Sequence, residues 1–340
     1  MTRPESFDVY LQWHTIDLIW TARSIQAIDL SRLDIGAEIL AATQSQTGAS
    51  KVIDTVFDKL FMQADGQLGR SATQWLSMLP LVHGVDSFGY VDKVREALHP
   101  GEVASWSWML DPRWAGQVAL VGDPVLGIIE AALAVEAARG QSFANVGNLS
   151  VDEVDEVVDL LIHKKKIGHF KAIWSQADDA VRLVQRGGVR MQTIFSPAAA
   201  TLRGLGVPIH ISTPAEGCRG WHSDLCLSAA TTGDTLDAAY AFLNWFQNGW
   251  AGACFARQGY YATFPGRIRA HLSREEWDYW YGGIRAAHPL PDPEGRICVP
   301  KDHRREGGSH RERMSRARVW NTFMDEHTHV VRRWRAFLEA

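Results

Sequence analysis

Short apolar runs alternate along the chain with longer segments whose apolar residues recur every three or four positions. Residues 118–121 are such a run, which ends at a Gly-Asp-Pro turn and is typical of a buried strand. Residues 128–139, rich in Ala, Glu and Leu and followed by Gly140, predict a helix, and residues 177–185 predict another. Strand and helix follow each other throughout, which is typical of an α/β protein.

Three further segments carry sharper local signals. Ser150 with Glu153 three residues later forms the capping box that starts a helix. Residues 189–195 alternate apolar and polar side chains, as a half-buried strand does. Residues 216–224, which read Glu-Gly-Cys-Arg-Gly-Trp-His-Ser-Asp, predict a strand that leads into a helix and then an aromatic loop at residues 257–261.

Composition narrows the class of protein. The 340 residues are 46% hydrophobic and 22% charged, which is enough for about two lobes with their own cores. The net charge of −4 offers no basic field, so we expect no nucleic-acid partner. No long apolar run predicts a membrane span, and the first residues lack a secretory signal. The cysteines at 218, 226, 254 and 298 form no Cys-x-x-Cys pair, and their disulfide state stays open.

Several segments, in the same order along the chain, carry a resemblance to a known family. They are residues 80–90, the Ser-Trp and Leu-Asp-Pro run at 105–118, residues 188–196 and the Gly-Trp-near-Asp segment at 216–224. The chain resembles the extracellular solute-binding proteins of ABC importers, the spermidine/putrescine-binding group in particular. By this resemblance the family's signal and first elements are absent from the start of the chain.

The resemblance implies a periplasmic binding protein-like (type II) α/β fold with two lobes and a ligand cleft between them. Lobe I is expected at 1–104 and 222–266, lobe II at 105–221, and a helical extension at 267–340. In that extension the fourteen-residue spacing of Trp320 and Trp334 predicts one buried helical face. The implied function is capture of a polyamine or related solute for delivery to a membrane permease. The protein is then a periplasmic monomer without catalytic residues, cofactor or metal.

A polyamine is a flexible cation with an apolar stem, so its site needs carboxylates and aromatic faces. By the resemblance, the ligand-binding residues are expected to be Trp221, Asp224, Ser223, Phe195, Tyr260, Ser87 and Trp174. One of Tyr260 and Tyr261 is expected to face the ligand and the other the core. Asp123 and Glu130 lie in the region of the family's second acidic pair, and Asp86 is expected to be a turn or cap residue.

The chain also departs from the family's pattern, which leaves alternatives open. Polyamine-binding members have one residue between tryptophan and aspartate, whereas His222 and Ser223 both stand between Trp221 and Asp224. Either Ser223 replaces the ligand carboxylate, or a bulge turns Asp224 toward the ligand. A hydrolase that uses His222 and Asp224 as acid and base is the rival class, and a truncated protein without ligand activity is a third. His222, Asp224 and Cys226 on one face would suit a soft metal only if a fourth ligand is present.

Overall fold

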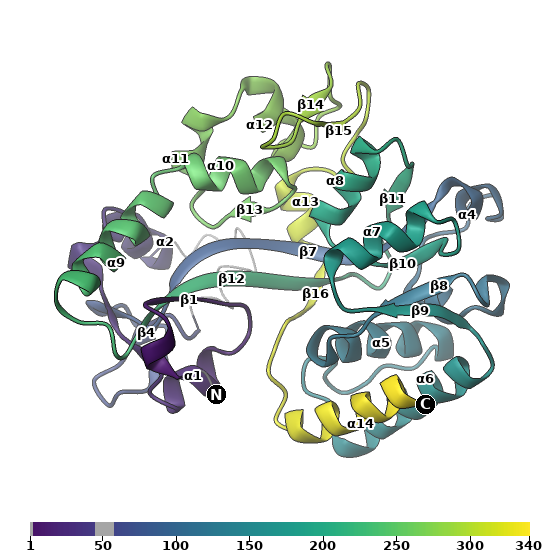
Figure 1. The fold of residues 1–340 in the computed structure, drawn as a ribbon, viewed down its shortest axis with the longest axis horizontal. Coiled ribbons are helices and arrows are strands. Elements are labelled where there is room, and N and C mark those ends of the chain that lie inside the picture. The colour runs from purple at the N-terminus through teal and green to yellow at the C-terminus, as the bar shows by residue number, and fades with distance from the viewer. Residues whose placement is uncertain (1–2, 45–57) are drawn as a thin grey trace. The chain divides into compact units, whose positions relative to one another are not determined.

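The computed structural model describes residues 3–44 and 58–340, which form two compact units (Figure 1). Unit 1 takes residues 1–84, 221–282 and 310–315, and unit 2 takes 85–220, 283–309 and 316–340. The chain passes between the units within two long strands, β7 (Leu79–Val91) and β12 (Cys218–Ser228), which are neighbours in the strand order. Three further passages follow residues 282, 309 and 315.

In unit 1, short strands extend β7 and β12 on their outer sides. Strand β12 pairs antiparallel with β1 (Val9–Gln12) and β2 (Ile25–Gln26), and β7 pairs antiparallel with β13 (Tyr261–Ala262). The register places Gln12 opposite Asp224 and Tyr261 opposite His83. A second small sheet has the order β3-β6-β4-β5, with bounds Ile28–Asp29, Trp75–Leu76, Phe61–Met62 and Leu68–Gly69.

The helices of unit 1 cover these strands and bury an apolar core of their own. Ile28, Phe61, Leu225 and Leu243 are fully or almost fully buried in it. The helix α9 (Gly233–Phe246) contributes Tyr240 and Leu243 to this core. The other helices in the described part of this unit are α1 (Ile16–Thr21), α2 (Gly36–Gln44), α10 (Trp250–Arg257), α11 (Pro265–Ile268), α12 (Arg274–Trp280) and α13 (His310–Met314), with 3-10 turns η1 (Pro4–Ser6), η2 (Leu30–Arg32) and η5 (Arg269–His271).

In unit 2, three parallel strands lie side by side with β8 (Val118–Val121) in the middle. Its neighbours are β9 (Phe170–Trp174) and β10 (Met191–Ile194), and β10 and β11 (Ile209–Ile211) pair antiparallel with β7. Strand β16 (Ala317–Trp320) pairs in parallel with the start of β12. Because β8, β9 and β10 are parallel, their carboxyl ends meet at one edge, where α/β sheets bind ligands.

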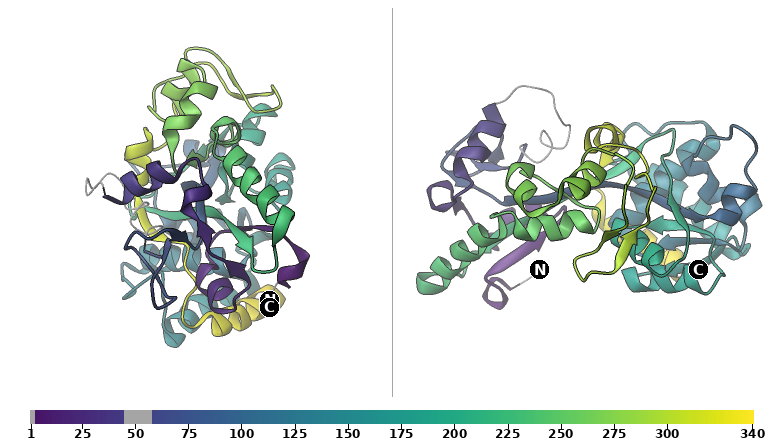
Figure 2. Two further views of the ribbon diagram at one scale, coloured as in Figure 1. Left: turned by 90° about the vertical axis from the view of Figure 1, so that its left-hand side faces the viewer. Right: turned by 90° about the horizontal axis from the view of Figure 1, so that it is seen from above.

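Helices cover both faces of this sheet, because successive strand residues point to opposite sides. Val118 and Leu120 pack in a core with α5 (Pro124–Arg139), α6 (Val151–Lys166) and α14 (His327–Glu339). Ala119 and Val121 pack in a second core with α7 (Ala177–Gln185) and α8 (Ser196–Gly204). The helices α6 and α14 lie side by side (Figures 1 and 2). The remaining elements are α4 (Asp92–Glu96), η3 (Trp106–Leu110), η4 (Pro112–Trp114), β14 (Leu290–Pro291) and β15 (Ile297–Val299).

The predicted α/β class and the sharpest local predictions are confirmed. Residues 118–121 and 177–185 form β8 and α7, and Ser150 makes the predicted capping box with Glu153. The predicted helical face through Trp320 and Trp334 is wrong, because Trp320 ends strand β16 and only Trp334 is helical. Its fourteen-residue spacing spans a strand, a loop and a helix. No helix in the described part of the chain is long and apolar enough to cross a membrane.

Candidate functional site

In unit 1, strand β12 carries a buried polar pair at the position where the sequence predicts a ligand-binding acid. Asp224 is 0% exposed and His222 is 7% exposed. The Nδ1 of His222 lies 2.7 Å from Oδ2 of Asp224, and the amide of Gln12 donates to the same oxygen. Gln12 is the partner of Asp224 in the register of β1 and β12, so the sheet itself brings these groups together.

The Asp224 carboxylate changes the protonation of its neighbours. Burial lowers the pKa of His222, but the charge and hydrogen bond of Asp224 outweigh burial, and the pKa is raised from its ordinary value. Burial, with the Asp224 charge adding to it, raises the pKa of the Cys226 thiol well above its usual range. Cys226 is therefore a poor thiolate, and His222 is held in a form that donates from Nδ1.

Ser223 lies on the other face of β12 and is buried. Its hydroxyl donates to the main-chain carbonyl of Gln12 over 3.3 Å, so this hydroxyl does not reach His222. A hydrolase that uses His222 and Asp224 as acid and base would have to take water as its nucleophile, because the Ser223 hydroxyl is not beside His222. The irregularity in β12 falls between Cys218 and Arg219, whereas the pairing with β1 is regular from Asp224 onward.

An aromatic pair in unit 1 lies beside Gly84, where β7 passes from one unit to the other. Trp221 and Tyr260 are half-buried and meet edge to face, with ring centroids 5.0 Å apart. The indole of Trp221 covers Gly84, where a Cβ atom would lie 2.9 Å from the ring. Tyr261 is fully buried, so the two tyrosines differ in exposure. Trp221 and Tyr260 thus form a local aromatic face in unit 1.

His83 on β7, which is close enough to His222 to feel its charge, belongs to a cluster of imidazole and phenol rings. His83 is buried, and its Nε2 lies 3.0 Å from Nε2 of His310 in α13. The ring of Tyr261 lies 4.5 Å from that of His310 and 5.9 Å from that of His83. Burial first, then the charges of His310 and His222, lower the pKa of His83 well below its usual range. Among the described residues, no group of three or more His, Cys, Asp or Glu side chains is placed to hold a metal ion.

In unit 2, two predicted aromatic residues come together at the carboxyl edge of the parallel strands. Trp174 ends β9 and Phe195 follows β10, and their rings meet edge to face with centroids 5.3 Å apart. Trp174 is 2% exposed and Phe195 is half-buried. Ser87 is buried on β7 opposite Ile194, and its hydroxyl donates to the carbonyl of Ser212 over 2.7 Å.

Sequence reasoning missed a buried ion-pair cluster in unit 2. Arg219 is 1% exposed, and it donates to Glu130 (2.9 Å), to Asn321 (2.9 Å) and to Asp86 (3.3 Å). Burial raises the pKa of Glu130 to about 7, although the charge of Arg219 opposes this shift. The prediction that Asp86 is a turn or cap residue is wrong, because it lies within β7 and pairs with Arg219.

Asp123 and Glu130, which lie in the region of the family's second acidic pair, have different roles in the structure. Asp123 accepts hydrogen bonds from the main-chain N–H groups of Val125 and Leu126 and so caps α5. Glu130 lies inside the same helix and pairs with Arg219. Arg219 in the Gly-Cys-Arg-Gly stretch could have predicted this cluster from the sequence. A cation inside a predicted buried strand costs free energy unless acidic or polar side chains pair with it.

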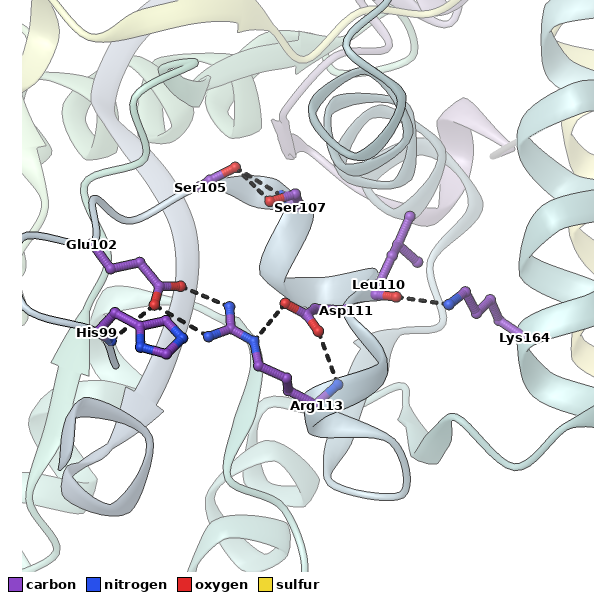
Figure 3. Close-up of polar contacts among 8 residues, drawn as sticks. All are labelled: His99, Glu102, Ser105, Ser107, Leu110, Asp111, Arg113 and Lys164. Atoms are coloured by element: carbon purple, nitrogen blue, oxygen red, sulfur yellow. Dashed lines mark hydrogen bonds and ion pairs between the residues drawn. The ribbon is translucent and has the colours of Figure 1, made fainter. Parts of the chain in front are cut away.

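The Ser-Trp and Leu-Asp-Pro segment of unit 2 is fixed by charges at its surface (Figure 3). The Arg113 guanidinium donates to both carboxylate oxygens of Glu102 (3.1 and 2.7 Å) and to Asp111 (2.8 Å). The hydrogen bond from Arg113 is the main cause that lowers the pKa of Glu102 to about 2. Lys164 donates to the carbonyl of Leu110 over 2.7 Å. Trp106, Trp108 and Trp114 are buried in the core of this unit, as packing residues are.

The four cysteines are all described and are free thiols, with Cys218, Cys226 and Cys298 buried. None of them forms a disulfide in this structure, which is the point that the sequence leaves open. The predicted site residues fall into four local groups: Asp224 with Ser223 beside Gln12, Trp221 with Tyr260, Trp174 with Phe195, and Ser87 with Ser212. The first two groups belong to unit 1 and the last two to unit 2.

Comparisons with known proteins show which solved structures share this architecture. No protein-family profile matches the chain, and no curated protein matches it. Solved structures do match over almost its whole length. A putative spermidine/putrescine ABC transporter protein from Listeria monocytogenes is 14% identical, with 99% of this chain and 87% of that chain covered and a TM-score of 0.62.

Two further solved structures show the same likeness. An ABC transporter substrate-binding protein from Bradyrhizobium japonicum is 15% identical, with 98% and 83% of the two chains covered and a TM-score of 0.57. The binding protein AgtB of A. tumefaciens R10, solved with agropinic acid, is 13% identical, with 99% and 84% covered and a TM-score of 0.57. The chain therefore has the two-lobed α/β fold of type II periplasmic binding proteins.

Proposed function

We propose that this protein is the substrate-binding component of an ABC importer. It captures a small organic solute, a polyamine or a related compound, and delivers it to a membrane permease. The observation that carries this proposal is the fold likeness to transporter-associated binding proteins along 98–99% of the chain. Fold alone does not fix function, so the local groups of aromatic and polar side chains at the predicted positions are the second support.

The proposal includes where and how the protein works. It places the protein in the periplasm, as a monomer that carries no cofactor and does no chemistry on its ligand. The lobes predicted at 1–104 with 222–266 and at 105–221, and the extension at 267–340, stay part of this proposal. Trp221, Asp224, Ser223, Phe195, Tyr260, Ser87 and Trp174 stay the residues predicted to form or support the ligand site.

The proposal is tested by thermal denaturation of the purified chain with and without small solutes. The panel consists of polyamines, amino acids, dicarboxylates and simple sugars, each at millimolar concentration. A compound that binds only the folded state adds about 2.7 kcal/mol of stability at a hundredfold excess over its Kd. We expect a raised Tm with one chemical class and confirmation by calorimetric titration. A cooperative unfolding transition that no compound in the panel shifts would contradict a solute-binding function.

A further inference from the structure

We propose that the ligand carries a carboxylate, and that His222 rather than Asp224 contacts it. This inference rests on the proposed solute-binding function and names the class of solute. It starts from the side chain that the sequence analysis assigns to the ligand's ammonium group. Asp224 is 0% exposed, and its Oδ2 already accepts hydrogen bonds from His222 and Gln12. Its other oxygen is also enclosed, so a ligand group does not reach this carboxylate.

The other acids near the predicted site are occupied as well. Asp86 and Glu130 both pair with the buried Arg219. Asp123 accepts two main-chain hydrogen bonds at the start of α5. A polyamine needs carboxylates that remain available for its ammonium groups, because an ammonium in a closed site without a partner is costly. Of the four acids that the sequence offers for this purpose, Asp224, Asp86 and Glu130 are buried and paired, and Asp123 is exposed and caps α5 through Oδ1.

The imidazole of His222 is, in contrast, placed to act as a donor. Its Nδ1 is bound by Asp224, which fixes the ring and leaves Nε2 as the free edge. Nε2 has no hydrogen-bond partner among the described residues, and 8% of the His222 side chain is exposed. A carboxylate that holds one imidazole nitrogen orients the other and favours the charged or N–H form there. His222 thus presents a directed donor for an acceptor or anion.

The surroundings of His222 favour the same chemistry. The groups that act on it electrostatically are Asp224 on its own strand, His83 on β7 and Lys59 from the segment before β4. His83 is buried, and its Nδ1 has no partner among the described residues. His310 and Tyr261 complete this cluster. Asp224 is the one acid among these groups, and it is fully buried. AgtB shows that this fold accommodates an acidic ligand.

Three compounds of similar length separate the alternatives. Putrescine carries two ammonium groups, 4-aminobutyrate one ammonium and one carboxylate, and succinate two carboxylates. We expect 4-aminobutyrate or succinate to raise the Tm and to bind in calorimetric titration, and putrescine and spermidine to do neither. Affinity for the carboxylate should be higher at pH 6 than at pH 8.5, because the charged form of His222 is lost as pH rises through its pKa.

The variant His222→Gln keeps an amide donor but loses the charge and the ring, and it should lower carboxylate affinity at least tenfold. His288→Gln is the matched control, because His288 is exposed on unit 2, and this variant should bind as the wild type does. If His222→Gln fails to unfold cooperatively, the ring signals of ¹⁵N-labelled histidines in the wild type replace it, and the ligand must shift those of His222.

The outcomes distinguish this inference from the proposed function. A Tm raised by polyamines and not by carboxylates overturns the inference and leaves the solute-binding function standing. Unchanged carboxylate affinity in folded His222→Gln, or unshifted His222 ring signals, overturns the role of His222. A Tm that neither these compounds nor the wider panel raises contradicts both proposals together.

Discussion

At the scale of single residues, the glycine that precedes the passage of β7 between the units has no room for a side chain. A Cβ atom on Gly84 would lie 2.9 Å from Cζ2 and 3.1 Å from Nε1 of Trp221. The variant Gly84→Ala should therefore push the indole out of place, with a loss of about 1–3 kcal/mol that is typical of overpacking. Chemical denaturation measures this loss, and the fluorescence of the chain should change in the folded state.

The control for this change is Gly266→Ala in the same unit. A Cβ atom at Gly266 meets nothing within 4 Å, and the residue is exposed in the short helix α11. Alanine is a better helix former than glycine, so this variant should be neutral or slightly stabilising. Equal stability of the two variants would mean that the ring of Trp221 moves aside at no cost.

Single residues also show where sequence reasoning ends. The strand pattern of 216–224 correctly separates His222 and Asp224 from Ser223, because alternation is a local property. The pattern does not predict that Asp224 is fully buried and hydrogen-bonded. The side-chain amide that donates to it belongs to Gln12, which is 212 positions away. The family resemblance predicts Asp224 of this segment as a ligand contact, and our inference assigns that contact to His222 instead.

At the scale of elements, α5 is joined to β7 and β12 through one buried charge cluster. Burial disfavours the ionised form of Glu130, and the charges of Asp86 and Asp123 add to this effect, so that together they outweigh the attraction of Arg219. With a folded pKa of about 7, against about 4.5 unfolded, Glu130 stays protonated in the folded state while it ionises in the unfolded chain. Stability should therefore fall as pH rises from about 4.5 to about 7, and then level off.

The variant Glu130→Gln tests this pH dependence. The amide oxygen still accepts from Arg219, and Arg219 is then balanced by Asp86 alone. We expect the variant to match the wild type near pH 4.5 and to be more stable at pH 8, by up to about 3 kcal/mol. Urea denaturation at a series of pH values measures the difference, and Glu96→Gln, at an exposed position, should follow the wild-type curve. Parallel curves for Glu130→Gln and the wild type would show that Glu130 is ionised in the folded protein.

Elements with local signals were predictable, and the cluster that joins them was not. Helix α7 coincides with the predicted 177–185, and the capping box of α6 follows from residues three positions apart. Arg219, in contrast, finds its partners 89, 102 and 133 positions away. For Trp320 the sequence predicted a contact pattern that does not exist. The fourteen-residue spacing to Trp334 fits a helix, but the residues between them form the end of a strand, a loop and only then a helix.

At the scale of the whole molecule, each unit has apolar cores made from its own residues. The core of unit 1 contains Leu243, and the larger core of unit 2 contains Leu133, both fully buried. Since β7 and β12 run through both units, the chain offers two crossings within strands that could transmit a loss of stability from one unit to the other. Whether the units unfold separately is thus a question about cooperativity, and matched core variants answer it.

We expect the units to behave as separate cooperative units, because burial and most core packing are internal to each. Leu133→Ala and Leu243→Ala should each cost about 2–5 kcal/mol from lost burial and the cavity left behind. Hydrogen exchange read by mass spectrometry should show the loss of protection mainly in peptides of the unit that carries the change. Leu205→Ala, at an exposed position of unit 2, should leave exchange unchanged throughout. Equal loss of protection in both units from either core variant would instead show that β7 and β12 make the whole chain fold as one cooperative body.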